Sequence, residues 1–171
     1  MASVGRLVEI IDTTLNLRGS ALYQRKRLVE AGVIQGKQGP GGDAPLADVA
    51  MVLTSVMIGT TATTRPDTVR AYMALQAPDR STFGDALTGY LADPHDLLEL
   101  AIDAVAPAAA IRHRDGTGNV ISTLFLSEED DPRPGFTRMA VLTANTFTQL
   151  AEAIRQAPPA TKRRRRRRRS V

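Results

Sequence analysis

The sequence contains no cysteine and no tryptophan. Without cysteine, disulfide bonds, thiolate catalysis and cysteine-ligated zinc are excluded. The only histidines, His95 and His113, lie far apart in sequence, so we expect neither a histidine-rich metal site nor a bound cofactor. Three tyrosines and four phenylalanines are too few for a surface that stacks single-stranded bases in series.

Long apolar runs are also lacking. No uncharged apolar stretch approaches the length of about 18 residues that a membrane-spanning helix needs. Residues 1–30 lack the apolar core and the small-residue cleavage site of a signal peptide. We therefore expect a cytoplasmic protein without a membrane partner.

Positive charge is concentrated near the end of the chain. The chain has 22 Lys and Arg against 18 Asp and Glu, but the part before Lys162 has a net charge of −4. The remaining cations are Lys162, Arg163, Arg164, Arg165, Arg166, Arg167, Arg168 and Arg169. Adjacent like charges repel and have nothing apolar to bury, so residues 158–171 are predicted to be a disordered tail.

The chemistry of this tail favours nucleic acid as its partner. Guanidinium groups pair with phosphate oxygens, and release of condensed counterions drives the association. The alternatives are a solubility tail, a contact with anionic lipid, an import signal, or a clamp on the acidic part of the protein. Residues 43–159 carry a net charge of −7, and Ser127–Asp131 is their densest acidic segment. Tail and acidic segment are predicted to associate within a chain or between subunits, with DNA competing for the tail.

Two helices are predicted in the basic first part of the chain, where residues 1–42 have a net charge of +3. Apolar residues at i, i+3, i+4 and i+7 from Val4 to Ile11 predict a helix over residues 3–14. Ser20 is the expected N-cap of a second helix that ends at Gly32. Its inward residues are expected to be Ala21, Leu22, Leu28 and Val29.

The second helix carries a row of hydrogen-bond donors. Arg and Gln can read guanine and adenine edges, while Lys and neighbouring Arg hold phosphates. Further phosphate contacts are expected from Arg18 before the helix and from Lys37 after it. The candidate base-reading residues are Tyr23, Gln24, Arg25, Lys26 and Arg27.

Residues 7–34, LVEIIDTTLNLRGSALYQRKRLVEAGVI, resemble helix-turn-helix proteins, particularly the compact units of bacteriophages and prophages. The ending RLVEAGVI looks like a recognition helix that enters the wing of a winged helix. The resemblance implies DNA contact by residues 23–27, whereas a structural helix with a solvated basic face is the alternative. Residues 35–42 form either such a wing or a flexible linker. A P-loop is not favoured, because neither Ser nor Thr follows Lys37.

Three more helices are predicted in the middle of the chain. An apolar segment indicates a buried helix over residues 46–58, and Thr64 with Asp67 has the start signal of a helix over residues 65–77. Together with the first two, these helices form a predicted helical domain over residues 1–78. Ser81–Asp85 starts a further helix that continues through Leu91.

The segment Asp93–Asp96 is the one cluster that invites a metal or acid–base site. Helix capping is the favoured explanation: Asp93 as the cap, Pro94 in the first position, and Asp96 beside the positive end of the helix dipole. The sequence therefore predicts a helix through Ala106, with Leu97, Leu98, Ala101, Ile102 and Val105 on its apolar face.

The pattern then changes to strands. Residues 110–114 and 120–126 flank a turn at 115–119 and predict a β-hairpin, and Phe136–Leu142 is a third strand. His113 is expected in the core or at an edge, opposite Arg112 and Arg114. Thr143 is predicted to cap a last helix whose inward residues are Phe147, Leu150, Ala151 and Ile154. We thus expect a mostly helical α+β protein with a three-stranded antiparallel sheet in a second domain over residues 79–157.

These features favour a phage or prophage transcriptional regulator that binds double-stranded DNA as a homo-oligomer, for instance a dimer. The plan also resembles small terminase subunits, DNA-packaging adaptors that assemble as rings. A structural protein that binds DNA or RNA through its tail is a third candidate. An enzyme is not expected, because no Ser or Thr has a nucleophile context and the carboxylates fall at caps or in loops.

Overall fold

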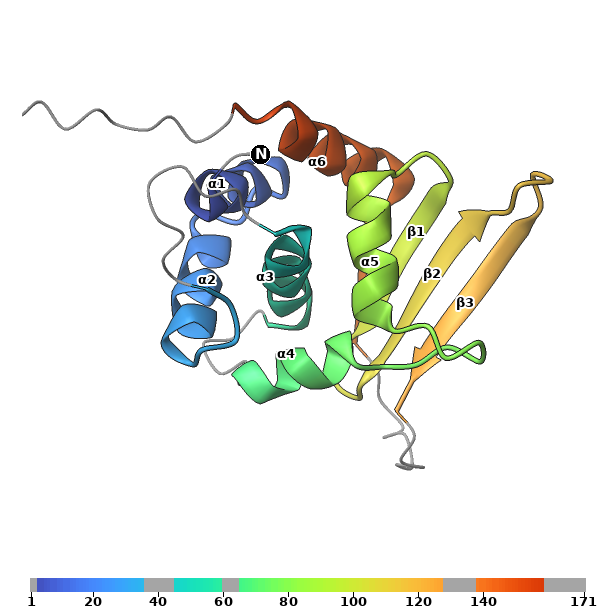
Figure 1. Cartoon of the computed structure of the whole chain (residues 1–171), viewed down its shortest axis with the longest axis horizontal. Coiled ribbons are helices and arrows are strands. Elements are labelled where there is room, and N and C mark those ends of the chain that lie inside the picture. Colours follow the sequence, from blue (N-terminus) through green and yellow to red (C-terminus); the bar gives the residue numbers. More distant parts are fainter. Residues whose placement is uncertain (1–2, 36–44, 60–64, 128–137, 159–171) are drawn as a thin grey trace, which may run out of the picture.

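A computed structural model describes residues 3–35, 45–59, 65–127 and 138–158. Within these residues the protein is α+β, as predicted, with six helices and four strands (Figure 1). The helices are α1 (Val4–Thr14), α2 (Ser20–Glu30), α3 (Leu46–Ile58), α4 (Pro66–Met73), α5 (Phe83–Ala92) and α6 (Ala144–Gln156). The strands are β1 (Leu97–Asp103), β2 (Ala108–Arg114), β3 (Val120–Leu126) and β4 (Met139–Thr143).

The four strands form one antiparallel sheet in the order β3-β2-β1-β4. The predicted hairpin is confirmed as β2–β3, and the predicted third strand is confirmed as β4, which starts at Met139 in the described part of the chain. β1 is central: Leu100 pairs with Ile111 of β2 on one side and with Leu142 of β4 on the other.

The helix predicted from Asp93 to Ala106 is wrong, since this segment contains β1. Asp93 closes α5 instead of opening a helix, because its N–H donates to the carbonyl of Gly89. Strand β1 lies between two others and is largely buried along its length. A strand buried in this way shows no alternation of polar and apolar residues, so its sequence also fits a helix. The sheet consequently has four strands where three were predicted.

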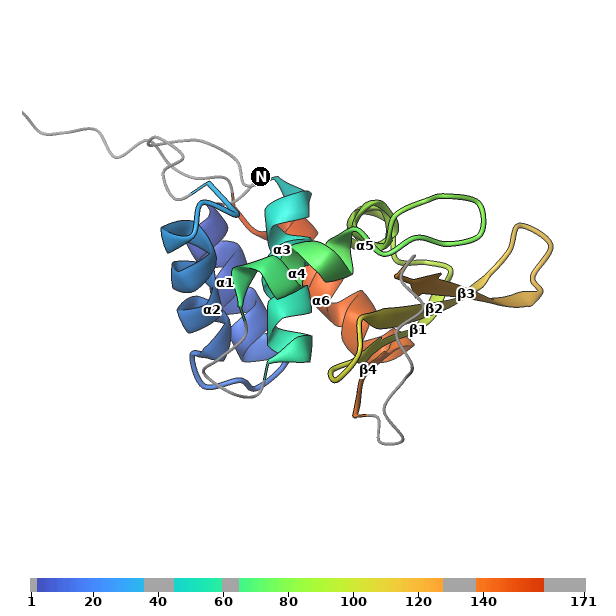
Figure 2. The ribbon, with the colours of Figure 1, turned by 90° about the horizontal axis from the view of Figure 1, so that it is seen from below.

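All helices in the described part of the chain lie on one side of the sheet (Figure 2). The buried side chains that point to that side include Leu100, Ile102, Ile111 and Phe125. The Phe125 ring packs edge-on against the Phe83 ring of α5, with 5.6 Å between the ring centroids. The exposed large apolar side chains of the opposite face are Val120, Leu124, Leu126, Met139 and Val141.

Helix α3 lies at the centre of the helical layer (Figure 1). It is buried along nearly its whole length, which agrees with the predicted buried helix over residues 46–58. It packs against α2, α4 and α5, while α6 packs against α1. Buried side chains from both sides of the expected domain boundary near residue 79 share this one cluster.

Several helix ends differ from the prediction. Gly19, not Ser20, is the N-cap of α2, with φ of 91°. The stop at Gly32 is confirmed: its φ is 65°, and Val33 N–H reaches the carbonyl of Leu28 at 2.9 Å in a Schellman arrangement. Helix α4 ends at Met73 instead of residue 77, because Gln76 forms β-bridges with Leu126 and Thr82.

Other predictions are confirmed or lie outside the described residues. Thr82 caps α5 by accepting the Asp85 N–H at 3.1 Å, and the predicted inward residues of α6 are all buried. Thr143 is at the N-cap of α6. Thr64, Lys37, residues 128–131 and residues 159–171 are not described. No described helix is long and apolar enough to cross a membrane.

Candidate nucleic-acid interface

The N-terminus of α2 is held by a carboxylate from α1. Asp12 Oδ1 accepts the Ala21 N–H at 2.8 Å, and its Oδ2 accepts the Leu22 N–H at 3.2 Å. The first N–H groups of a helix have no partner within the helix, and a negative charge there also complements the helix dipole. Asp12 therefore fixes where α2 starts relative to α1, a role that its sequence position did not reveal.

The turn between α1 and α2 is tightly wound. Asn16, Arg18 and Gly19 all have positive φ, of 52°, 53° and 91°. A left-handed conformation is costly for residues other than glycine and is tolerated best by Asn and Asp. Arg18 adopts it with an exposed side chain directly before α2. The predicted phosphate-contacting cation thus lies at the N-terminal end of the candidate recognition helix.

Gln24 is directed into the core, which removes it from the predicted DNA-reading surface. Its side chain is 3% exposed, and its Oε1 accepts a hydrogen bond from the Ser55 hydroxyl of α3 at 3.1 Å. The spacing Ala21, Gln24, Leu28 places these three buried residues on one helical face. Gln24 anchors α2 to α3 and does not face solvent.

The outward face of α2 carries Leu22, Tyr23 and Lys26. Leu22 was predicted to be inward but is 51% exposed, and Tyr23 is 48% exposed. The Lys26 side chain is 74% exposed, with its Nζ 3.8 Å from Glu30 Oε1. An exposed pair of this length holds Lys26 only weakly, so its ammonium stays accessible to another anion.

Arg25 and Arg27 lie at the sides of the helix and are half-buried. The Arg25 Nε is buried without a hydrogen-bond partner. The predicted row of five residues therefore divides by helical geometry: one inward, two lateral and two outward. Lys37 and the tail cations from Lys162 to Arg169 lie outside the described residues.

The remaining candidate chemistry is at the surface. His95 Nε2 lies 3.7 Å from Asp93 Oδ1, both with largely exposed side chains. His113 is half-buried on β2, and the centroid of its ring lies 5.9 Å from that of Tyr90. It faces away from the exposed Arg112 and Arg114, as predicted, but β2 is an inner strand, so His113 is not at a sheet edge. In the described ranges no three His, Asp or Glu side chains gather as metal ligands would.

Comparisons of the chain with protein-family models, with curated proteins and with solved structures gave no match. The helix-turn-helix resemblance therefore depends only on the sequence of residues 7–34.

Proposed function

We propose that the protein binds double-stranded DNA, with the outward face of α2 in the major groove and the Arg-rich tail on the phosphates. The observation that supports this most is the fixed presentation of Tyr23 and Lys26. Asp12 holds the start of α2 and Gln24 its inner face, so the backbone positions that carry Tyr23 and Lys26 are fixed before any ligand arrives. Such preorganisation reduces the entropy lost on binding.

The chemistry of α2 and of the tail gives them different roles in the proposed complex. A single helix can place a few side chains on base edges, and these contacts give specificity. Eight tail cations would add a sequence-independent salt dependence with a slope of about −7 in log K against log salt. We propose that the biological role is that of a phage or prophage transcriptional regulator.

The proposal is tested by selection from a random duplex library at physiological salt, followed by titration of the enriched duplex. Full-length protein is compared with a full-length variant in which Lys162 and Arg163–Arg169 are replaced by Gln. An enriched motif from both proteins, with a salt slope that falls by about 7 in the variant, is the expected result.

Two substitutions test α2 itself. Tyr23→Ala and Lys26→Ala should each weaken binding to the selected duplex by about tenfold or more, as expected for contacts made in the groove. Arg155→Ala is the matched control, because Arg155 is an exposed cation on α6, a helix outside the proposed groove-contacting face of α2. Equal affinities of all three variants, or binding that disappears entirely with the tail charges, would make α2 a structural helix.

A further inference from the structure

Strand β3 has an open backbone edge. It is at one end of the strand order, with β2 on one side and no strand on the other. At Leu126 the N–H and the carbonyl point away from β2 and form hydrogen bonds of 3.0 and 3.1 Å with the backbone of Gln76. In an antiparallel strand alternate residues direct their backbone groups to the same side. Val120, Ser122 and Leu124 therefore also point outward, and no described residue bonds to them there.

The side chains of β3 do nothing to protect this edge. Natural edge strands are usually guarded by Lys, Pro, bulges or a covering segment. The sequence of β3, VISTLFL, has neither a charge nor a proline. Its exposed apolar residues are Val120, Ile121, Leu124 and Leu126. An uncharged, apolar, exposed edge is a template for another strand.

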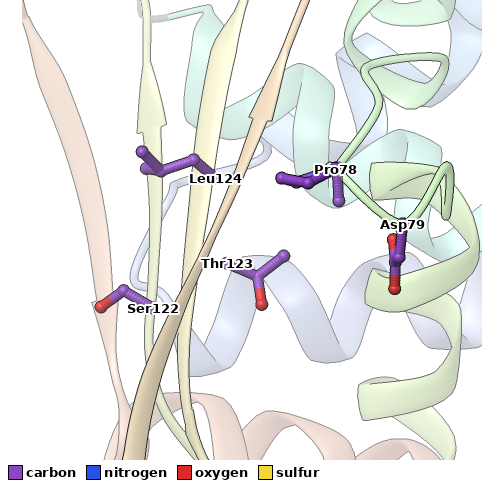
Figure 3. Close-up of a pocket in the computed structure, with 6 residues that line it drawn as sticks. Pro78, Asp79, Ser122, Thr123 and Leu124 are labelled. Atoms are coloured by element: carbon purple, nitrogen blue, oxygen red, sulfur yellow. The ribbon is translucent and has the colours of Figure 1, made fainter.

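A pocket lies beside the same edge. Its volume is about 350 Å³, and it is lined by Ala77, Pro78, Asp79, Ser122, Thr123 and Leu124. Figure 3 shows Thr123 on the side of β3 that faces Pro78, with Leu124 and Ser122 directed to the other side. The loop after Gln76 thus begins as a neighbour of β3 and then separates from it, which leaves the pocket between them.

We propose that β3 pairs with β3 of a second copy of this chain, antiparallel about a two-fold axis at Ser122. This register sets Ser122 opposite its own copy and Val120 opposite Leu124, and it forms about six new backbone hydrogen bonds. Two four-stranded sheets become one continuous sheet. Exposed apolar side chains of one copy cover those of the other. Because β3 has no charged residue, the pairing brings no like charges of the two strands together.

The pocket accounts for the choice of a second copy over an unrelated strand. In this register Ile121 of one copy lies opposite Thr123 of the other, on the same face of the joined sheet. Thr123 lines the pocket, so the 41%-exposed Ile121 side chain of each copy enters the pocket of its neighbour. Ile121 and the pocket residue Thr123 are two positions apart on β3. The two-fold axis therefore sets Ile121 of each copy beside Thr123 of the other.

The first test is the oligomeric state of the full-length protein. Nuclease treatment and about 0.5 M salt prevent the tail from joining chains through nucleic acid. Sedimentation should show a concentration-dependent dimer, and Ile121→Lys or Leu124→Lys should raise the dissociation constant at least about tenfold, because the Lys side chain puts a charge where apolar groups are buried. The matched control is Val141→Lys on β4, since Val141 is 49% and Leu124 53% exposed; it should leave the constant unchanged.

The second test is cross-linking. The chain has no cysteine, so Ser122→Cys introduces a single thiol. Directly opposed residues of a hydrogen-bonded pair have Cα atoms about 5.5 Å apart, within the range of a disulfide. Oxidation should give a covalent dimer with Ser122→Cys and not with Val141→Cys.

Three outcomes would overturn the inference. One is a wild-type protein that stays monomeric up to about 0.5 mM, where even a sub-millimolar dimer would be populated. Another is a dimer that Val141→Lys weakens as much as Leu124→Lys does. The third is equal cross-linking of the two cysteine variants. The interface does not depend on the proposed DNA contact of α2, so either can fail alone.

Discussion

Two glycines of α5 differ in one respect that decides the effect of adding a methyl group. A Cβ on Gly84 would lie 2.9 Å from the Met73 carbonyl oxygen and 2.9 Å from Met73 Cε, whereas a Cβ on Gly89 would meet nothing within 4 Å. The Met73 oxygen belongs to the backbone of α4 and cannot turn aside as a flexible side chain can. Gly84 is therefore the point where α5 crosses the end of α4.

The two substitutions to alanine should consequently have opposite signs. In a helix, Ala is favoured over Gly by about 1 kcal/mol, and Gly89→Ala should gain most of that. Gly84→Ala gains a similar amount but must separate α4 from α5, and overpacking of this kind costs about 1–3 kcal/mol. We expect Gly89→Ala to stabilise the protein by about 0.5–1 kcal/mol and Gly84→Ala to destabilise it by up to about 2 kcal/mol.

Urea denaturation of the full-length protein, followed by far-ultraviolet circular dichroism, measures both free energies of unfolding. Gly89→Ala is the control, because it reports the helix-propensity gain alone. The reasoning about the α4–α5 crossing would be refuted by a Gly84→Ala variant that is as stable as Gly89→Ala.

Three further substitutions test individual contacts in the same assay. Asp12→Ala should cost about 1–2 kcal/mol by leaving the Ala21 and Leu22 N–H groups without their carboxylate; an unchanged stability would mean that water replaces it. Tyr72→Phe should cost about 1–2 kcal/mol, because the single proton of the buried hydroxyl is directed at the Asp103 carbonyl, with the Ala106 carbonyl oxygen 3.2 Å away, and links α4 to the β1–β2 turn. Burial, followed by the charge of Asp103, raises the pKa of Tyr72 to about 12. Hydrogen bonds from Thr117 and Asn119 lower the pKa of Asp115 to about 2, below the value of about 3.9 in an unfolded chain. The ionised carboxylate thus stabilises the folded state above about pH 4, so the stability difference between wild type and Asp115→Ala should be constant at higher pH and shrink as the pH falls from about 4 through about 2. A difference that stays the same from about pH 6 to about pH 2 would contradict this origin.

The sequence predicts well those helices and strands in which the spacing of apolar residues reveals the buried face. Helix α6 has Phe147, Leu150 and Ile154 on one face, and these residues are buried as expected. Strand β1 gives no such signal, because it lies between β2 and β4 and has few exposed positions. Its neighbour β4 follows it by more than thirty residues, and no local pattern reveals pairing over that separation.

For residues 23–27 the sequence predicted the helix correctly, but not which of their side chains face outward. Residues 23–27 do lie on a helix that follows a turn, yet Gln24 faces the core. The positions of Ala21 and Leu28, three residues before it and four after it, place it on their face. What spacing cannot supply is Ser55, thirty-one residues away, whose hydroxyl makes the burial of an amide tolerable. Polar residues on an inward face are assigned to the surface unless their partner is known.

The dimer proposed for β3 and the DNA contact proposed for α2 together constrain the DNA site. Helix α2 and strand β3 lie at opposite ends of the molecule (Figure 1). A domain of this length has a radius of gyration of about 15 Å, so pairing through β3 would separate the two α2 helices by on the order of 60 Å. Recognition helices that read adjacent half-sites lie about 34 Å apart, one turn of DNA. The selected motif should therefore be a single half-site or a pair spaced by about two turns. Palindromic half-sites one turn apart would show that, on DNA, the two copies meet through a surface nearer to α2 than β3 is.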